Sequence, residues 1–199
     1  MSRPATNRAP RSGPIFLAGH LALDFLNTQM RLKGVLVDVF QRDQDVLDWL
    51  NQAGLPAAST GRGGANNSLL DSARALRENI RSLVQKRKGG RRGDPSLLNR
   101  FLFGAESHSR LVWNKSRALK VETVRRCHTH EAILGPVAEA AADLLANADF
   151  RFVKRCKDET CVLWFSDNTR SHHRRWCSMA LCGNRHKVAA YRRRVRNDG

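Results

Sequence analysis

Four cysteines in the last quarter of the sequence have the residue type and the spacing to hold a metal ion. They form two pairs, each with four residues between its members, and fifteen residues separate the pairs. The four residues are Cys156, Cys161, Cys177 and Cys182. A zinc ion takes four such ligands in a tetrahedron, and a short loop can present two sulfurs at once. The two pairs therefore predict one structural zinc ion, and we expect these cysteines to be its ligands.

A disulfide framework and a set of buried free thiols both account less well for the cysteines. A disulfide framework needs an oxidising compartment, and Met1–Gly13 has no apolar segment of the kind found in secretory signals. Four buried free thiols would not account for the repeated spacing. A single further cysteine, Cys127, has no partner at a suitable distance, and we interpret it as a core or surface thiol rather than a nucleophile.

Three histidines lie close to the pairs in sequence and could replace a cysteine as ligand. They are His172, His173 and His186. Because four cysteines already complete the set, we interpret the histidines as polar surface residues. Four thiolates leave no open position for a reactive water, and the chain has no phosphate-binding or nucleophile-elbow motif. We therefore predict that the protein is not an enzyme.

The charge of the chain indicates a polyanionic partner. Lysine and arginine number 35 against 18 acidic residues, a formal net charge of +17. Residues 150–199 contain 13 of these cations and 4 acids, whereas residues 1–149 contain 22 and 14. Nucleic acid is the commonest polyanion in a cytosol, so the basic C-terminal end favours nucleic-acid binding. The alternative is that the charge only reflects an arginine-rich composition.

The predicted nucleic-acid contacts are cations on the C-terminal helix and on the segment before it. A helix covered in cations suits phosphate contacts and entry into the major groove. Val188 and Ala189, with Tyr191 beside them, are left to pack against the protein. The predicted contacts are Arg170, Arg174, Arg175, Arg185, Lys187, Arg192, Arg193, Arg194 and Arg196.

The elements around the cysteines predict a treble-clef-like zinc finger: knuckle, hairpin, knuckle, helix. Residues 162–165 should form a strand, residues 167–169 a turn and residues 172–176 the returning strand. A helix should begin near Ser178, with Cys182 in its first turn. So small a unit buries little apolar area, and metal binding should supply much of its folding energy.

The chain before the finger predicts a mainly helical domain over residues 14–149, after a flexible basic tail at 1–13. Alternating apolar residues at 110–124 predict a small hairpin, and residues 35–40 a short extended segment. Helical periodicity predicts helices over 14–30, from an N-cap at Asp43 to Gly54, over 68–88, from Asp94–Pro95 onward, and over 129–148. The fold class is therefore mainly α with a small β-hairpin (α+β), and we expect residues 14–149 to fold without zinc.

Two polar residues, Asp24 and Asn27, interrupt the apolar pattern of the first predicted helix. One interpretation is that they cap and bridge buried backbone groups. The other is that they line a pocket for a small-molecule effector in the N-terminal domain.

Short motifs carry a specific resemblance. Residues 175–185 read RWCSMALCGNR and follow LWFSDNTR at 163–170, which resembles the CGNR zinc-finger family. LALDFLNT at 21–28 and ARALRE at 73–78 are similar to the ABATE domain that accompanies this finger. The resemblance covers most of the chain. It implies a stress-related transcription regulator, a DNA-binding finger, and zinc ligands at the same four cysteines.

The CGNR motif residues have physical reasons to follow a ligand. Gly183 permits close backbone approach or a positive φ, and Asn184 can hydrogen-bond the knuckle. Arg185 could pair with Asp167 or face a phosphate.

We therefore predict a zinc-containing DNA-binding regulator. It consists of a helical domain at residues 14–149 and a zinc finger at residues 150–199. The alternative is a protein- or RNA-interaction module in which the zinc finger is only a structural staple. No apolar run is long enough to span a membrane, so we expect no membrane partner and a cytoplasmic location, nucleoid-associated if the protein binds DNA. The sequence carries no signal for an oligomeric state.

Overall fold

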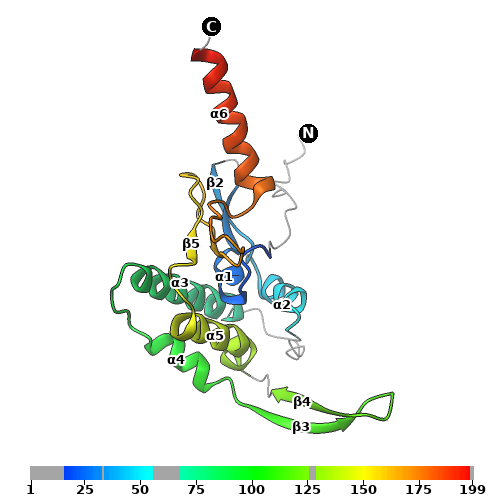
Figure 1. Cartoon of the computed structure of the whole chain (residues 1–199). Helices are drawn as coiled ribbons and strands as arrows, with labels where there is room; N and C mark the ends of the chain where they lie inside the picture. The colour runs from blue at the N-terminus through cyan, green and yellow to red at the C-terminus, as the bar shows by residue number, and fades with distance from the viewer. Residues whose placement is uncertain (1–15, 33, 56–67, 126–128, 198–199) are drawn as a thin grey trace, which may run out of the picture.

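The computed structural model describes residues 16–32, 34–55, 68–125 and 129–197, without the side chains of Arg193 and Asn197. Helices pack into a central body from which two elements stand out: a long hairpin at one end and the C-terminal helix at the other (Figure 1). The helices are α1 Leu21–Leu26, α2 Asp43–Gln52, α3 Ser68–Lys88, α4 Ser96–Phe103, α5 His130–Asn147 and α6 Asn184–Asn197, with a π-helical turn, η1, at Met179–Gly183.

Three antiparallel strand pairs complete the described part of the chain. They are β1 Gln29–Leu32 with β2 Val35–Asp38, β3 Ser107–Trp113 with β4 Leu119–Arg125, and β5 Val153–Arg155 with β6 Trp164–Ser166. The β3–β4 hairpin has the predicted type and position but longer strands. Helices dominate and strands form only small pairs, so the predicted α+β class is confirmed.

The two long helices, α3 and α5, form the frame of the body. On α3 the predicted stripe is buried, with Leu76, Ile80 and Val84 fully inaccessible. Helix α5 begins after Thr129, whose hydroxyl accepts from the Ala132 N–H at 3.1 Å. On the same helix Gly135 has no room for a side chain, because a Cβ would lie 2.5 Å from that of Ala105.

The first predicted helix is wrong in length. Residues 14–30 do not form one helix: α1 covers only Leu21–Leu26, and the chain then turns into β1. The Thr28 hydroxyl donates to the Phe25 carbonyl at 2.7 Å, so it satisfies the helix end and lets the chain leave it. Asp43 is the first residue of α2 and not its cap. Its carboxylate instead accepts from the Leu70 N–H at 2.8 Å, at the start of α3.

A buried ion pair ties α3 to the β1–β2 hairpin. The Arg77 side chain is only 2% exposed and donates to Thr28 Oγ1 at 2.9 Å and to Asp38 Oδ1 at 2.7 Å. A second guanidinium nitrogen contacts the other Asp38 oxygen. Both charges are thus paired, as burial requires.

Helix α1 joins the helical body to the C-terminal segment. It packs against α3 and α5 on one side and against β6 on the other. The Ala18 carbonyl, just before α1, accepts from the Ser166 N–H at 2.7 Å. Leu163, Trp164 and Phe165 belong to the same buried cluster as α1. The apolar core is therefore continuous from the helices into the segment that carries the cysteines.

Candidate metal centre and basic helix

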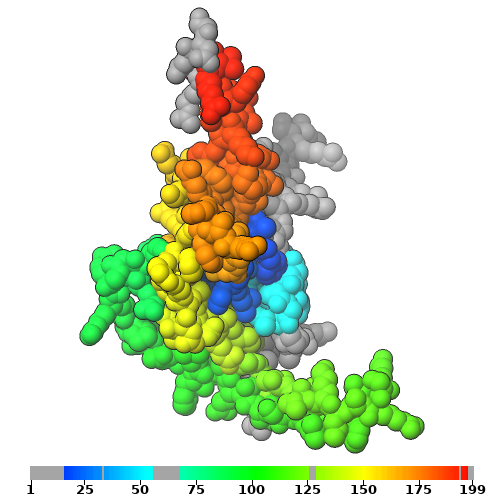
Figure 2. All heavy atoms as spheres, viewed as in Figure 1, coloured from blue at the N-terminus to red at the C-terminus, as the bar shows by residue number. Residues whose placement is uncertain are grey.

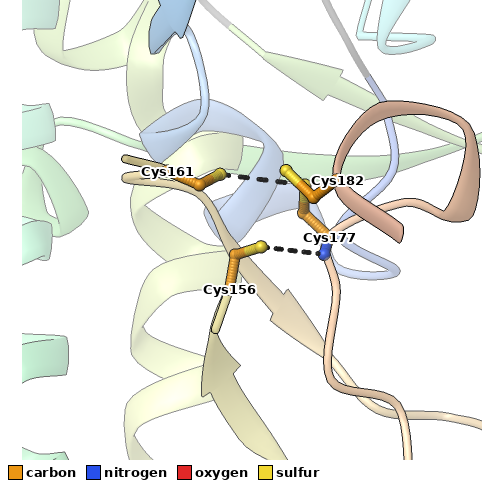
Figure 3. Close-up of side chains that lie close together, drawn as sticks. All are labelled: Cys156, Cys161, Cys177 and Cys182. Atoms are coloured by element: carbon orange, nitrogen blue, oxygen red, sulfur yellow. Dashed lines mark hydrogen bonds between the residues drawn. The ribbon is translucent and has the colours of Figure 1, made fainter. Parts of the chain in front are cut away.

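The four cysteines meet in one buried cluster, with sulfur atoms all within 4.8 Å of one another (Figure 3). Cys161 Sγ lies 3.8 Å from Cys177 Sγ, which lies 3.5 Å from Cys182 Sγ. A tetrahedron with metal–sulfur bonds near 2.3 Å has sulfur–sulfur edges of about 3.8 Å. The cluster therefore has the size of a zinc site, and it contains no histidine among the described residues.

The first cysteine pair sits on the turn of the β5–β6 hairpin. The Cys156 N–H donates to the Leu163 carbonyl at 2.9 Å, and the Cys161 N–H to the Asp158 carbonyl at 2.9 Å. These bonds fold residues 156–161 into a tight loop with both sulfurs on one side. β6 is thus paired with β5 across this knuckle.

The predicted returning strand at residues 172–176 is wrong, because that segment is irregular. Asp167 organises it. Its buried carboxylate accepts from the Arg174 N–H at 2.9 Å, from Thr169 Oγ1 at 2.6 Å and from Lys154 Nζ at 2.7 Å. Burial opposes ionisation of this carboxyl, but the hydrogen bonds from Lys154 and Thr169 outweigh it and hold the pKa of Asp167 well below its usual range.

The second pair leads into α6. Ser178 caps the turn η1, its hydroxyl accepting from the Ala180 N–H at 3.1 Å, and Cys182 lies inside η1. Gly183 allows the predicted close approach and has no positive φ. A Cβ there would lie 2.7 Å from the sulfur of Met179, which fills that space.

The pKa values of the four thiols indicate that the cluster needs a bound cation if all four are to be thiolates. Hydrogen bonding to Cys156 is the largest cause that raises the pKa of Cys161, to about 12, and burial adds to it while the hydrogen bond with Cys177 opposes it. The pKa of Cys177 is raised further, by hydrogen bonding to Cys156 and Cys161 and then by burial. Hydrogen bonds from these two thiols lower the pKa of Cys156. Without a cation, the favoured arrangement is a single thiolate among three protonated thiols. Four thiolates in so small a volume require a cation to balance their charge. The donor set therefore fits one structural zinc ion.

Arg185 links the two knuckles. Its Nη2 lies 3.2 Å from Cys182 Sγ and 2.7 Å from Asp158 Oδ2, so it joins the second pair to the loop of the first. His186 Nε2 lies 3.2 Å from the same carboxylate oxygen, and its ring stacks on Trp176 with centroids 4.0 Å apart. Arg185 thus pairs with Asp158 and not with Asp167.

Asp158 is the functional residue that sequence reasoning missed. It stands between the first two cysteines, as an acid two residues after Cys156 in a basic segment, and that position is the signal. Its Oδ1 accepts from Thr160 N and Oγ1, at 2.9 and 2.6 Å, which leaves Oδ2 for α6. One carboxylate therefore both shapes the first knuckle and holds the helix that follows the second.

The predicted nucleic-acid residues separate into two groups. Arg174 is half-buried: it donates to Trp176 O and Leu17 O, both at 3.0 Å, and to Cys177 O, and it lies over the Phe165 ring at 4.3 Å. Together with Arg185, it holds the finger together. The others whose side chains are described are exposed: Arg170, Arg175, Lys187, Arg192, Arg194 and Arg196. The side chain of Arg193 and all of Cys127 lie outside the described residues.

Helix α6 projects from the body after its first turn, so its sides face solvent (Figures 1 and 2). The expected packing of Val188 and Ala189 is therefore wrong. Val188 is 49% exposed, Tyr191 69% and Val195 56%. A groove of about 540 Å³ runs between α6 and the first knuckle. Its lining is Asp158, Glu159, Thr160, Arg185, His186, Ala189, Arg192 and Arg196.

Comparison with known proteins identifies both parts of the chain. The CGNR zinc finger matches residues 153–195. The ABATE family, described as "Putative stress-induced transcription regulator", matches residues 19–148. No curated protein matches the chain. No helix in the described ranges has both the length and the apolar character to cross a membrane. Since the ABATE match spans more than half of the sequence, the chain belongs to the ABATE family and carries a CGNR zinc finger.

Proposed function

We propose that this protein is a transcription regulator that binds DNA through the α6 helix of its zinc finger. The observation that supports this most directly is the placement of α6. The helix is anchored at the sulfur cluster, and it projects with those of its cations whose side chains are described exposed. A projecting, positively charged helix is the element that enters DNA grooves in many regulators. The family matches support the general function, a transcription regulator with a zinc finger, and the proposal adds DNA binding through α6.

Cys156, Cys161, Cys177 and Cys182 are the zinc ligands in this proposal. Their four thiolates fill the tetrahedron, so the metal is structural and leaves no position for a substrate. A zinc ion bound there fixes the start of α6, because Cys182 lies in η1 directly before it.

The DNA contacts in this proposal are the predicted cations other than Arg174 and Arg185. They are Arg170, Arg175, Lys187, Arg192, Arg193, Arg194 and Arg196. Arg174 and Arg185 are positioning residues, since their guanidinium groups already bond to finger backbone, sulfur and carboxylate. The protein acts in the cytoplasm, on the nucleoid. The competing function is a protein- or RNA-interaction module in which the finger is only a staple.

Binding of the full-length, zinc-loaded protein to randomised double-stranded DNA tests the proposal. Affinity should fall as salt rises, by about 0.9 log unit per log unit of salt for each phosphate contacted. Replacing Arg192, Arg193 and Arg194 by alanine should lower this slope by up to about three units. The matched control replaces Arg87, Arg91 and Arg92, which are exposed at the end of α3 and in the segment after it, and should keep the slope.

Equal binding by the wild type and the α6 variant would show that α6 is not the DNA-binding element. Tighter binding to single-stranded or structured RNA than to any DNA in the library would favour the interaction module instead.

A further inference from the structure

Three exposed apolar side chains form one stripe along α6. Val188, Tyr191 and Val195 are spaced three and four residues apart, so they share a helix face, and each is about half or more exposed. The exposed fractions of these side chains show that no described element covers this face, and α6 projects away from the body (Figure 1). The stripe is therefore a surface that a partner can contact.

Cations flank the stripe on both sides. At 100° per residue, Arg192 and Arg196 lie between about 65° and 110° from the stripe in one direction. Lys187 and Arg194 lie at similar angles in the other direction, about 75° and 95° away. Residues 184–197 contain no acidic side chain. Arg192 and Arg196 share their groove with Asp158 and Glu159, and the exposed cations on both sides of the stripe suit a partner with an apolar or mixed floor between two negatively charged walls.

We infer that this face reads base pairs in the major groove of double-stranded DNA, with the stripe on the groove floor and each cation row on one phosphate backbone. This inference rests on the proposed DNA-binding function. The major groove, about 12 Å wide, admits an α-helix, and its floor carries the thymine methyl group that apolar side chains contact. The Tyr191 hydroxyl adds a donor and an acceptor for base edges.

The length of the stripe sets the size of the site. From Val188 to Val195 the helix rises by about 10.5 Å, which corresponds to about three base pairs at 3.4 Å each. Each cation row has a phosphate backbone within reach over the same length. One finger should therefore read a short site rich in thymine or adenine–thymine pairs.

A second copy of this chain is the other occupant that the spacing would fit, and charge argues against it. In a coiled coil with Val188, Tyr191 and Val195 at the seam, the flanking positions are Lys187, Arg192 and Arg194. All three are cations, so two such helices would place like charges opposite one another. DNA supplies the opposite charge at the same positions.

The test compares a stripe variant with the intact full-length protein, loaded with zinc. The variant carries Val188→Ala, Tyr191→Ala and Val195→Ala, which raise the helix propensity and keep every cation. Its salt slope on random DNA should match that of the wild type. Its ratio of affinities for the selected site over random DNA should fall about tenfold or more, since base contacts carry the sequence information.

Uracil substitution sharpens the test. Replacing thymine by uracil in the selected site removes only the methyl group. It should weaken the wild type about fourfold for each methyl that the stripe buries and leave the stripe variant unchanged. A control variant with Leu111, Leu119 and Val121 replaced by alanine in the β3–β4 hairpin removes exposed apolar groups elsewhere and should keep the preference.

Each contrary outcome has its own meaning. A stripe variant that keeps the full preference overturns the inference while leaving DNA binding intact, as does a wild type that binds without preference. A dimer in sedimentation that the stripe variant loses would make the face an interface between copies. A wild type that binds no DNA overturns the proposed function, and this inference with it.

Discussion

The side-chain amide of Asn27 pairs with the main chain of Trp164 in both directions, across 137 residues of sequence. Its Nδ2 donates to the Trp164 carbonyl at 2.8 Å, and its Oδ1 accepts from the Trp164 N–H at 2.9 Å. One side chain thus acts as a neighbouring strand would for β6. The ABATE part thus holds the zinc-finger hairpin through hydrogen bonds to main-chain N–H and C=O groups, which are the groups that join strands in a sheet.

Replacing Asn27 by alanine should lower the free energy of unfolding by about 2 to 6 kcal/mol. The change leaves two buried main-chain groups of Trp164 without partners, at about 1–3 kcal/mol each. Urea unfolding followed by circular dichroism measures the loss. Asn51→Ala, at an exposed position of α2, is the control and should change stability by less than about 0.5 kcal/mol. A loss for Asn27→Ala no larger than that of the control would contradict the role given to this pair.

Removing the metal should destabilise the helical part as well as the finger. Leu163, Trp164 and Phe165 belong to the core that surrounds α1, so a finger that unfolds exposes that core. Chelation should therefore lower the melting temperature of the whole chain in one transition. A Cys161→Ser variant should show the same lowered melting temperature, with zinc loss measured by elemental analysis. Two separate transitions, with the first confined to residues 150–199, would instead support the independent folding expected from the sequence.

Replacing Arg185 by alanine should weaken zinc binding about 10- to 100-fold, the usual effect of removing a group that supports a ligand. The guanidinium contacts Cys182 Sγ and holds the Asp158 loop, so its loss loosens both knuckles. Competition with a chromophoric chelator gives the affinity. Lys187→Ala, a cation-to-alanine change two residues further along α6, should leave zinc affinity unchanged. Equal affinity in both variants would mean that Arg185 does not act on the metal site.

Stability should fall as the pH drops below 6.5 because of His20. Burial lowers the pKa of His20 below its ordinary value of 6.5, and the nearby Asp143 only partly offsets this. The unfolded state therefore binds the proton first, so stability is full above pH 6.5 and decreases as the pH falls toward the folded pKa. Protonation also removes the Nδ1 lone pair that accepts from the Ala22 N–H at the start of α1.

A His20→Asn variant keeps an acceptor at this N-cap without titrating in that range. Unfolding curves at several pH values should show a difference between wild type and variant that grows below pH 6.5. Because acid protonates zinc thiolates in both proteins alike, only this difference reports on His20. A difference independent of pH would contradict the assignment.

The features that could be predicted from sequence are those encoded by spacing. The repeated cysteine spacing predicts a four-sulfur cluster, which the structure contains. Strong apolar periodicity predicts the bounds of α3 and α5 to within a residue or two. In both cases a single local pattern admits few alternatives. The β3–β4 hairpin also followed from alternation.

The errors concern partners far apart in sequence. An apolar stripe at helical spacing looks the same whether buried or exposed, so Val188 was expected to pack. A strand of three residues is too short to show an alternating apolar pattern in the sequence. The pairing of β6 with β5 depends instead on the knuckle between them and on the Asp167 network. Asn27 interrupts an apolar run, and only the fold shows that its partner is Trp164.

The anchoring of α6 at one end has a consequence for how this helix forms. A helix of 14 residues is marginal in water, because ordering its first turn is costly and little is gained later. In this chain η1, Cys182 and the Arg185–Asp158 pair hold that first turn in place. The sulfur cluster therefore nucleates the helix, and amide protection should decline steadily from Asn184 toward Asn197.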